Sequence, residues 1–178
     1  MFYRRITIAV VLAPVCSGAA RAQISAATFD SRAPNYAWIA GGVGVGGFPR
    51  GTEERGGLLS AWEVWLAHGP IAVGTHASSI GDFSGNARTQ RAVAAGGRWA
   101  VESSTLMLAG GVSRTYACNS AGEQSGSCTP VRASRAPFVE GVVEINNEIF
   151  GLHLSYFRVM HATGHHGGSI GLVLGKLR

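Results

Sequence analysis

The sequence lacks three features that would point to common classes of function. It has no basic run with interleaved aromatic residues, so a nucleic-acid surface is not indicated. Beyond the N-terminal region, no segment is apolar over the roughly 18 residues that a transmembrane helix needs. It contains only three cysteines, and a cysteine-based metal site would want more ligands near them. These absences argue against a nucleic-acid partner, a helical membrane protein and a cysteine-bound metal.

Residues 1–22 have the pattern of a secretory signal peptide. Two arginines precede a short apolar run that a proline interrupts, and Ala20 and Ala22 offer small side chains at the cleavage positions. The run is too short for a membrane anchor. We predict cleavage after Ala22, which leaves a lead-in segment, residues 23–35, and one domain, residues 36–178.

Loss of the signal peptide changes the charge of the protein. The whole chain has 15 Lys and Arg against 10 Asp and Glu, but three of the arginines lie within residues 1–22. The exported chain therefore has 12 basic and 10 acidic residues, a net charge of about +2. A balance so close to neutral favours neither nucleic acid nor an acidic substrate.

Two cysteines remain in the exported chain, Cys118 and Cys128, on either side of the polar stretch 119–127. In an exported protein such a pair predicts a disulfide that closes a loop.

From residue 36 onward the chain alternates with the two-residue period of β-strands. The clearest example is Pro137–Phe157, PFVEGVVEINNEIFGLHLSYF, in which Asn146 and Asn147 separate two alternating runs and predict a hairpin turn. These two runs are expected strands six and seven. The other six expected strands cover residues 36–48, 58–67, 71–76, 91–100, 105–116 and 169–177.

The expected connections alternate in length. Longer polar loops follow strands one, three, five and seven, among them residues 48–56 and 78–89, whereas residues 68–70, 102–104 and 146–147 form minimal turns. In an up-and-down sheet this puts short turns at one end and long loops at the other. Eight antiparallel strands of about ten residues with this asymmetry are typical of a small outer-membrane barrel. Closure removes sheet edges, which would leave backbone groups unpaired in lipid.

A soluble exported barrel that binds a ligand is the main structural alternative, since its strands would alternate as well. The two faces favour the membrane. The bulky apolar side chains share one face, and the other face has mostly small residues with scattered charges, which suits a narrow interior better than a water-exposed surface. The predicted fold class is therefore all-β, an eight-stranded antiparallel up-and-down transmembrane β-barrel.

Three sequence segments strengthen this interpretation. Together with the signal peptide, the GGVGVGGF opening, the AGGVSR strand and the closing IGLVLGKLR resemble small OmpA-like or OmpX-like outer-membrane β-barrel proteins. The resemblance covers nearly all of the exported chain. It implies location in the outer membrane, contact with outer-membrane lipid, and contact with an extracellular ligand or protein through the long loops.

The alternation places a set of polar side chains on the inner face. Arg98 is expected to be the main cation opposite the carboxylates. A charge inside a narrow barrel must be paired, so a salt-bridged plug is favoured over acid–base catalysis. The expected interior network is Glu63, His76, Arg98, Glu140, Glu144 and His153, with Ser155 nearby.

A second group of polar residues lies between strands seven and eight. His161 and Thr163 resemble the His-x-Ser pair of lipid A deacylase barrels, in which histidine is the base and the hydroxyl attacks an acyl ester. Strand eight has no acidic residue to orient the histidine. Alternatively, His161, His165 and His166 are weak candidates for a transition-metal site. The default is a solvated loop, and we predict a barrel without catalysis or cofactor, with an envelope-structural or loop-mediated binding role.

Overall fold

The computed structural model describes residues 34–50, 52–101, 103–119, 128–130, 135–147, 149–161 and 164–176. The predicted signal peptide and nearly all of the lead-in segment lie outside these residues. Among the described residues, no helix is long and apolar enough to cross a membrane. The strands are β1 (Asn35–Arg50), β2 (Glu53–His68), β3 (Ile71–Gly81), β4 (Asn86–Val101), β5 (Ser104–Asn119), β6 (Cys128–Pro130), β7 (Ala136–Asn146), β8 (Phe150–Val159) and β9 (His166–Lys176).

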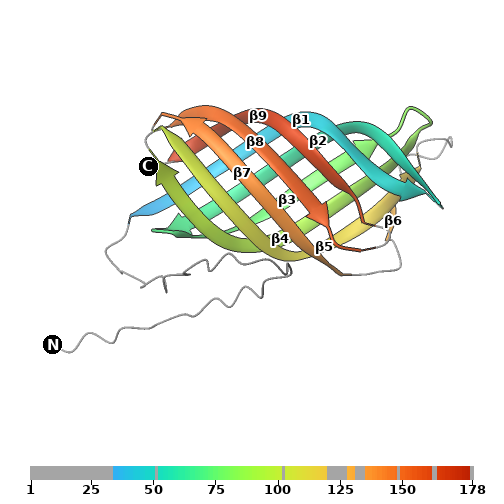
Figure 1. Ribbon diagram of the computed structural model, residues 1–178, viewed down its shortest axis with the longest axis horizontal. Helices are drawn as coiled ribbons and strands as arrows, with labels where there is room; N and C mark the ends of the chain where they lie inside the picture. Colours follow the sequence, from blue (N-terminus) through green and yellow to red (C-terminus); the bar gives the residue numbers. More distant parts are fainter. Residues whose placement is uncertain are drawn as a thin grey trace, which may run out of the picture.

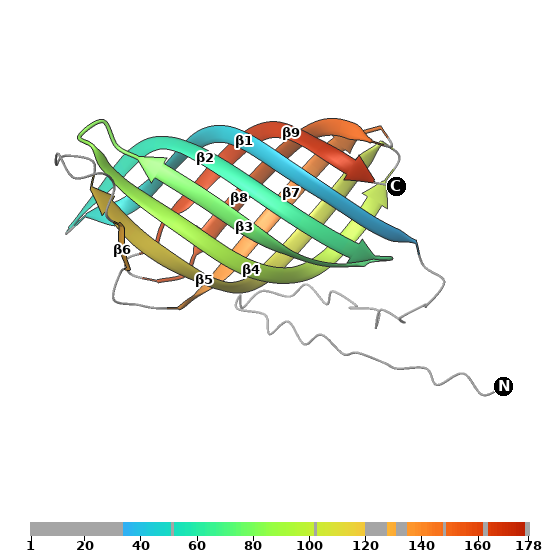
Figure 2. The ribbon, with the colours of Figure 1, turned by 180° about the vertical axis from the view of Figure 1, so that it is seen from behind.

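Eight of these strands form one closed antiparallel barrel (Figures 1 and 2). The order around the ring is β4-β3-β2-β1-β9-β8-β7-β5, and β4 pairs with β5 to close it. Within the described residues, the short strand β6 pairs with the end of β5. The predicted eight-stranded up-and-down barrel is confirmed, because each barrel strand pairs with its neighbours in the chain and β1 pairs with β9.

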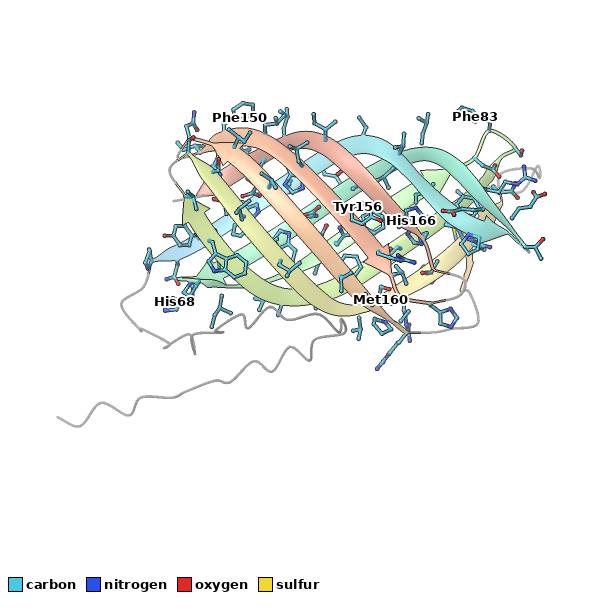
Figure 3. All side chains as sticks on the ribbon, viewed as in Figure 1. His68, Phe83, Phe150, Tyr156, Met160 and His166 are labelled. Atoms are coloured by element: carbon cyan, nitrogen blue, oxygen red, sulfur yellow. A yellow bond between two sulfur atoms is a disulfide. The ribbon has the colours of Figure 1, made fainter. Side chains whose placement is uncertain are left out.

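The barrel has two different ends (Figure 1). We call the end with the connections β2–β3, β4–β5 and β7–β8 the turn end; β1 starts and β9 finishes there. We call the opposite end the loop end; it holds the connections β1–β2, β3–β4, β5–β7 and β8–β9, and β6 extends from it. Figure 3 shows His68 and Phe150 at the turn end and Phe83 at the loop end.

The inward and outward faces follow the predicted alternation. In β2, Trp62 is 62% exposed whereas Trp65 is fully buried. The burial of β7 and β8 alternates in the same way, with Val143 and Leu152 outward. Apolar side chains therefore cover the outer wall, and the buried interior contains the polar residues together with alanines and a few aromatic rings.

The strands are longer at the loop end than the sequence predicted. Residues 48–56, expected to be a loop, lie mostly within the β1–β2 ladder, where Phe48 is the register partner of Arg55. The expected loop 78–89 is reduced to residues 82–85. The predicted loop lengths were therefore wrong at these two connections. Charged and glycine residues suggested loops, but a strand that continues beyond an apolar belt can present them to water while its backbone stays paired.

Glycine makes room for the buried tryptophan of β2. Gly74 in β3 is the register partner of Trp65, and a Cβ atom at Gly74 would collide with the indole ring. The absence of a side chain at this position lets the indole lie flat against β3. Trp65 is thereby held next to the polar residues of the interior.

Candidate functional site

Five ionisable side chains from four strands meet inside the barrel. Alternation turns each of them inward, and each is no more than 2% exposed. We call them the interior cluster: Glu63 of β2, His76 of β3, Glu140 and Glu144 of β7, and His153 of β8.

Glu63 is the centre of the cluster. Its Oε1 atom lies 3.6 Å from Nδ1 of His76 and 3.1 Å from Nε2 of His153. Its Oε2 atom accepts a hydrogen bond of 3.0 Å from the indole Nε1 of Trp65. His76 is its register partner on the adjacent strand, whereas His153 approaches from the far side of the ring, since β1 and β9 lie between β2 and β8. The carboxylate is therefore fixed from both walls.

Each imidazole contacts two carboxylates. Nδ1 of His76 lies 2.8 Å from Oε1 of Glu140 across the lumen, and Nδ1 of His153 lies 3.4 Å from Oε1 of Glu144 on the neighbouring strand. The cluster thus forms one chain of contacts, Glu140–His76–Glu63–His153–Glu144. A chain of alternating carboxylates and imidazoles inside a narrow barrel ties opposite walls together and fills the lumen.

Aromatic rings separate the cluster from the loop end. The imidazole of His76 packs against the rings of Phe138 at 5.2 Å and Phe157 at 4.6 Å between centroids. Phe157 in turn meets His165 edge-on at 5.6 Å. Both phenylalanines are almost fully buried. The ion pairs consequently lie in a dry setting, where electrostatic interactions are stronger than in water.

Arg98, which the sequence predicts to be the main cation of the interior, lies against two aromatic rings. It is buried, and its guanidinium carbon lies 4.1 Å above the ring of Tyr36 and 5.7 Å from that of Trp38. The groups in contact with Glu63 and Glu140 include the two histidines, which the sequence analysis had placed in the network without this role. The alternation pattern could not show which inward residues meet, because it predicts the face on which a residue lies and not its position along the barrel axis.

The three histidines near the loop end do not converge. His161 is exposed, and His165 is buried beside Phe157. His166 is half-buried, with Nε2 3.3 Å from Oε1 of Glu54, and Figure 3 shows it beside Tyr156 on the outer wall. Among the described residues, the one group that could hold a metal ion lies in the interior cluster and not here. The geometry therefore does not support a metal site formed by these three histidines.

Of the two residues that resemble the deacylase pair, the structure describes only His161. His161 follows the end of β8, whereas Thr163 lies outside the described residues.

The interior cluster itself contains neither a hydroxyl nor a thiol. Ser155, which the sequence also placed inside, is hydrogen-bonded to Ser169 at 2.9 Å. The cluster can thus bind a proton or a cation and brace the barrel, but none of its members is a nucleophile of the serine or cysteine type.

The two cysteines are joined. Cys118 near the end of β5 and Cys128 at the start of β6 form a disulfide and are also register partners. The bond fastens β6 to the loop end of β5, and the predicted pairing is present in the structure.

Arginines mark the loop-end border of the apolar outer wall. Arg91 of β4 and Arg114 of β5 are exposed register partners, and one step toward the turn end the next outward pair is Val93 and Val112. Together with Arg135 they line a groove of about 520 Å³ on the outer wall. Sequence reasoning missed this group, because its members are 21 to 44 positions apart and only the barrel register aligns them.

Comparison with known proteins supports the fold at the level of structure alone. No family model and no curated protein matches the sequence. Neisserial surface protein A (NspA) superposes with a TM-score of 0.62 at 9% identity, covering 79% of this chain and 97% of that one. The N-terminal β-barrel domain of Pseudomonas aeruginosa OprF gives 0.56 at 9% identity, covering 79% and 96%. Ail of Yersinia pestis gives 0.55 at 11% identity, covering 80% and 99%.

Each of these three structures matches almost completely, and each is a small eight-stranded outer-membrane barrel. The predicted resemblance to OmpA-like and OmpX-like proteins is confirmed in this sense. The chain is an all-β protein with the closed, eight-stranded antiparallel fold of the small outer-membrane β-barrel proteins.

Proposed function

We propose that this protein is a non-catalytic barrel of the bacterial outer membrane, with an envelope-structural role and a loop end that contacts the surroundings. One observation carries the proposal: the closed barrel is apolar outside and charged inside. A soluble barrel has the opposite arrangement, since its large apolar side chains must leave water. Outward apolar and inward polar residues on alternate positions are the pattern of a barrel whose solvent is lipid.

The outer wall supplies the apolar belt that such a location needs. Its side chains come from all eight barrel strands and are between about one-third and two-thirds exposed. In water this surface would be far larger than the few hundred Å² that monomeric proteins usually tolerate in one apolar patch. Representative members are Val43, Trp62, Val93, Leu108, Val143, Leu154 and Ile170.

The arginines indicate how the barrel is oriented. Arg91, Arg114 and Arg135 border the belt at the loop end, where the longer connections lie. We infer that the loop end faces outward and that these guanidinium groups contact lipid phosphates, which they can bind in a bidentate way. The turn end then faces the periplasm, in keeping with the short periplasmic turns of such barrels.

The loop end also presents an aromatic side chain on a well-defined turn. Phe83 is 90% exposed. Oδ1 of Asp82 accepts hydrogen bonds from the backbone N–H groups of Ser84 at 2.9 Å and Asn86 at 2.8 Å, and Gly85 has φ of 80°. A rigid, exposed aromatic residue is a typical anchor in protein contacts. Ail, which has the same fold, was solved with the heparin analogue sucrose octasulfate. We place the extracellular contact of the present protein at this end.

No observation favours the soluble ligand-binding barrel. Its ligand would need an open lumen, whereas the lumen here is filled by the interior cluster and by aromatic rings such as Phe138 and Phe157. The filled lumen also favours a bracing role over conduction.

Cell fractionation tests the location. We expect the protein in the outer membrane, with faster gel migration before boiling than after it, since folded barrels remain compact in detergent. Single cysteines then test the faces: in a Cys118→Ser/Cys128→Ser background, a lipid-confined reagent should label cysteines at positions 99 and 143 but not at 98, 140 and 144. Recovery as a detergent-free periplasmic protein, or labelling of the opposite set, would overturn the proposal.

A further inference from the structure

Three members of the interior cluster converge in a way that a plug alone does not require. Glu63, His76 and Glu140 come from three strands, are fully buried, and each offers one ligand atom within 4.8 Å of the other two. We propose that these residues bind one divalent transition-metal ion of the Zn²⁺ type inside the barrel. This inference does not depend on the membrane location proposed above.

The donor set selects the class of ion. One imidazole nitrogen and two carboxylate oxygens are ligands that Zn²⁺ accepts at about 2.0–2.2 Å. Ca²⁺ takes six to eight oxygens, and Mg²⁺ usually keeps several waters. A dry interior with one nitrogen and few oxygens suits neither of them. It suits a borderline ion with low coordination number, such as Zn²⁺ or Co²⁺.

The distances are close to those of a coordination sphere. Bonds of that length in a tetrahedral site put neighbouring ligand atoms roughly 3.3–3.5 Å apart. Nδ1 of His76 is 3.6 Å from Oε1 of Glu63. The contact from His76 to Glu140 is shorter, 2.8 Å, and would open by about half an ångström around an ion. His153 is not part of this group of three, although its Nε2 lies 3.1 Å from the same Glu63 oxygen.

A second observation points to a ligand: polar atoms of the cluster are buried without hydrogen-bond partners. Within the described part of the chain, Oε2 of Glu140 is in this state. Buried polar atoms in folded proteins nearly always have a partner. Rotation of the Glu140 carboxylate would let an ion beside it become the partner of this free oxygen. The ion would also bring two positive charges to an interior cluster that contains three carboxylates.

The neighbouring residues prepare Glu63 for this role. The Trp65 indole donates a hydrogen bond to Oε2 of Glu63, which leaves Oε1 directed at both histidines. A hydrogen bond of this kind from outside the coordination sphere orients a ligand and typically raises metal affinity by about 10- to 100-fold. Phe138 and Phe157 cover His76 and exclude water that would compete for the ion.

Cobalt refolding tests the inference. Chelator-treated protein is refolded in detergent micelles with Co²⁺, desalted, and measured for metal content and visible absorption. We expect one ion per folded barrel with the intense absorption of four-coordinate Co²⁺. Glu140→Gln should weaken binding by at least about tenfold. The matched control is His166→Gln, which removes a half-buried histidine outside the interior cluster, 3.3 Å from Glu54, and should leave the cobalt content unchanged.

The results separate an interior site from surface binding. A folded wild-type barrel that retains no cobalt, equal retention by Glu140→Gln, or loss of cobalt with His166→Gln would each overturn the inference. Should Glu140→Gln fail to fold, ¹⁵N NMR of histidine side chains in the wild-type protein decides. Zn²⁺ must then shift the His76 signals and leave those of His161 and His166 in place; unshifted His76 signals refute the site.

Discussion

Replacing His153 by leucine should destabilise the barrel through the carboxylate that the substitution leaves behind. His153 lies 3.1 Å from Glu63 and 3.4 Å from Glu144. Glu63 keeps His76 and the indole of Trp65 as partners. Glu144, with no hydrogen bond to either carboxylate oxygen among the described residues, loses the imidazole that faces it. The variant therefore tests whether the interior cluster is a chain of mutually dependent charges.

The magnitude follows from burial. Both partners of the His153–Glu144 contact are at most 2% exposed, and removing one member of a buried ion pair typically costs about 3–5 kcal/mol. Adding Glu144→Met to His153→Leu also removes the unpaired charge. Replacing a whole buried ion pair by apolar residues often changes the free energy of unfolding very little. The double variant should therefore regain stability, with a coupling free energy of about 1–3 kcal/mol.

The assay is denaturant unfolding in lipid vesicles, followed by tryptophan fluorescence and by gel migration without boiling. The wild type, His153→Leu, Glu144→Met and the double variant form the cycle. His166 and Glu54 offer a matched control, since their contact of 3.3 Å is similar but their side chains are 40% and 62% exposed. For that pair, His166→Leu and Glu54→Met should couple by less than about 1 kcal/mol.

An interior cycle that is additive within about 0.5 kcal/mol would contradict this prediction. Glu144 would then be neutral or solvated in the folded barrel, and the ion-pair chain would end at His153. A coupling in the control cycle as large as the interior one would also contradict it, because burial would no longer explain the difference.

Three further outcomes are expected. Protein taken from its native compartment should show no free thiol at Cys118 or Cys128 by mass spectrometry, and replacing both by serine should lower the free energy of unfolding by about 2–3 kcal/mol in the chain-entropy account. Thr163→Val should leave any release of acyl chains from lipid A unchanged; release by the wild type that this variant abolishes would establish an enzyme. Gly74→Val should displace the indole of Trp65 at a cost of about 1–3 kcal/mol, and an unaltered near-ultraviolet circular dichroism spectrum would contradict the packing described.

Alternation along the chain predicted the fold and the faces, because closing a sheet forces every second residue outward. Trp62 and Trp65 illustrate this: they are three positions apart and lie on opposite faces, 62% and 0% exposed. Alternation does not predict how far along the barrel axis a residue lies. Glu63 meets His153, 90 positions away, only through the tilt and stagger of the strands. The pairing of histidines with carboxylates therefore had to come from the structure.

Strand ends were predicted less well for a related reason. Residues 48–56 include proline, glycine and four charged side chains, a composition typical of loops. In the structure, Arg55 and Glu53 form an exposed ion pair of 2.9 Å at the start of β2. A closed barrel supplies backbone partners to such a segment, and pairing prevails over local propensity.

The placement of the interior cluster across the ring has a consequence for the order of events in folding. Every barrel strand can pair with its chain neighbour as a local hairpin, whereas the contacts of His76 with Glu140 and of Glu63 with His153 span 64 and 90 residues and exist only once the sheet has curled. Interactions that form after the transition state slow unfolding and leave the folding rate nearly unchanged. The cluster would then slow the unfolding of the closed barrel and so set its lifetime, without changing how fast the barrel assembles.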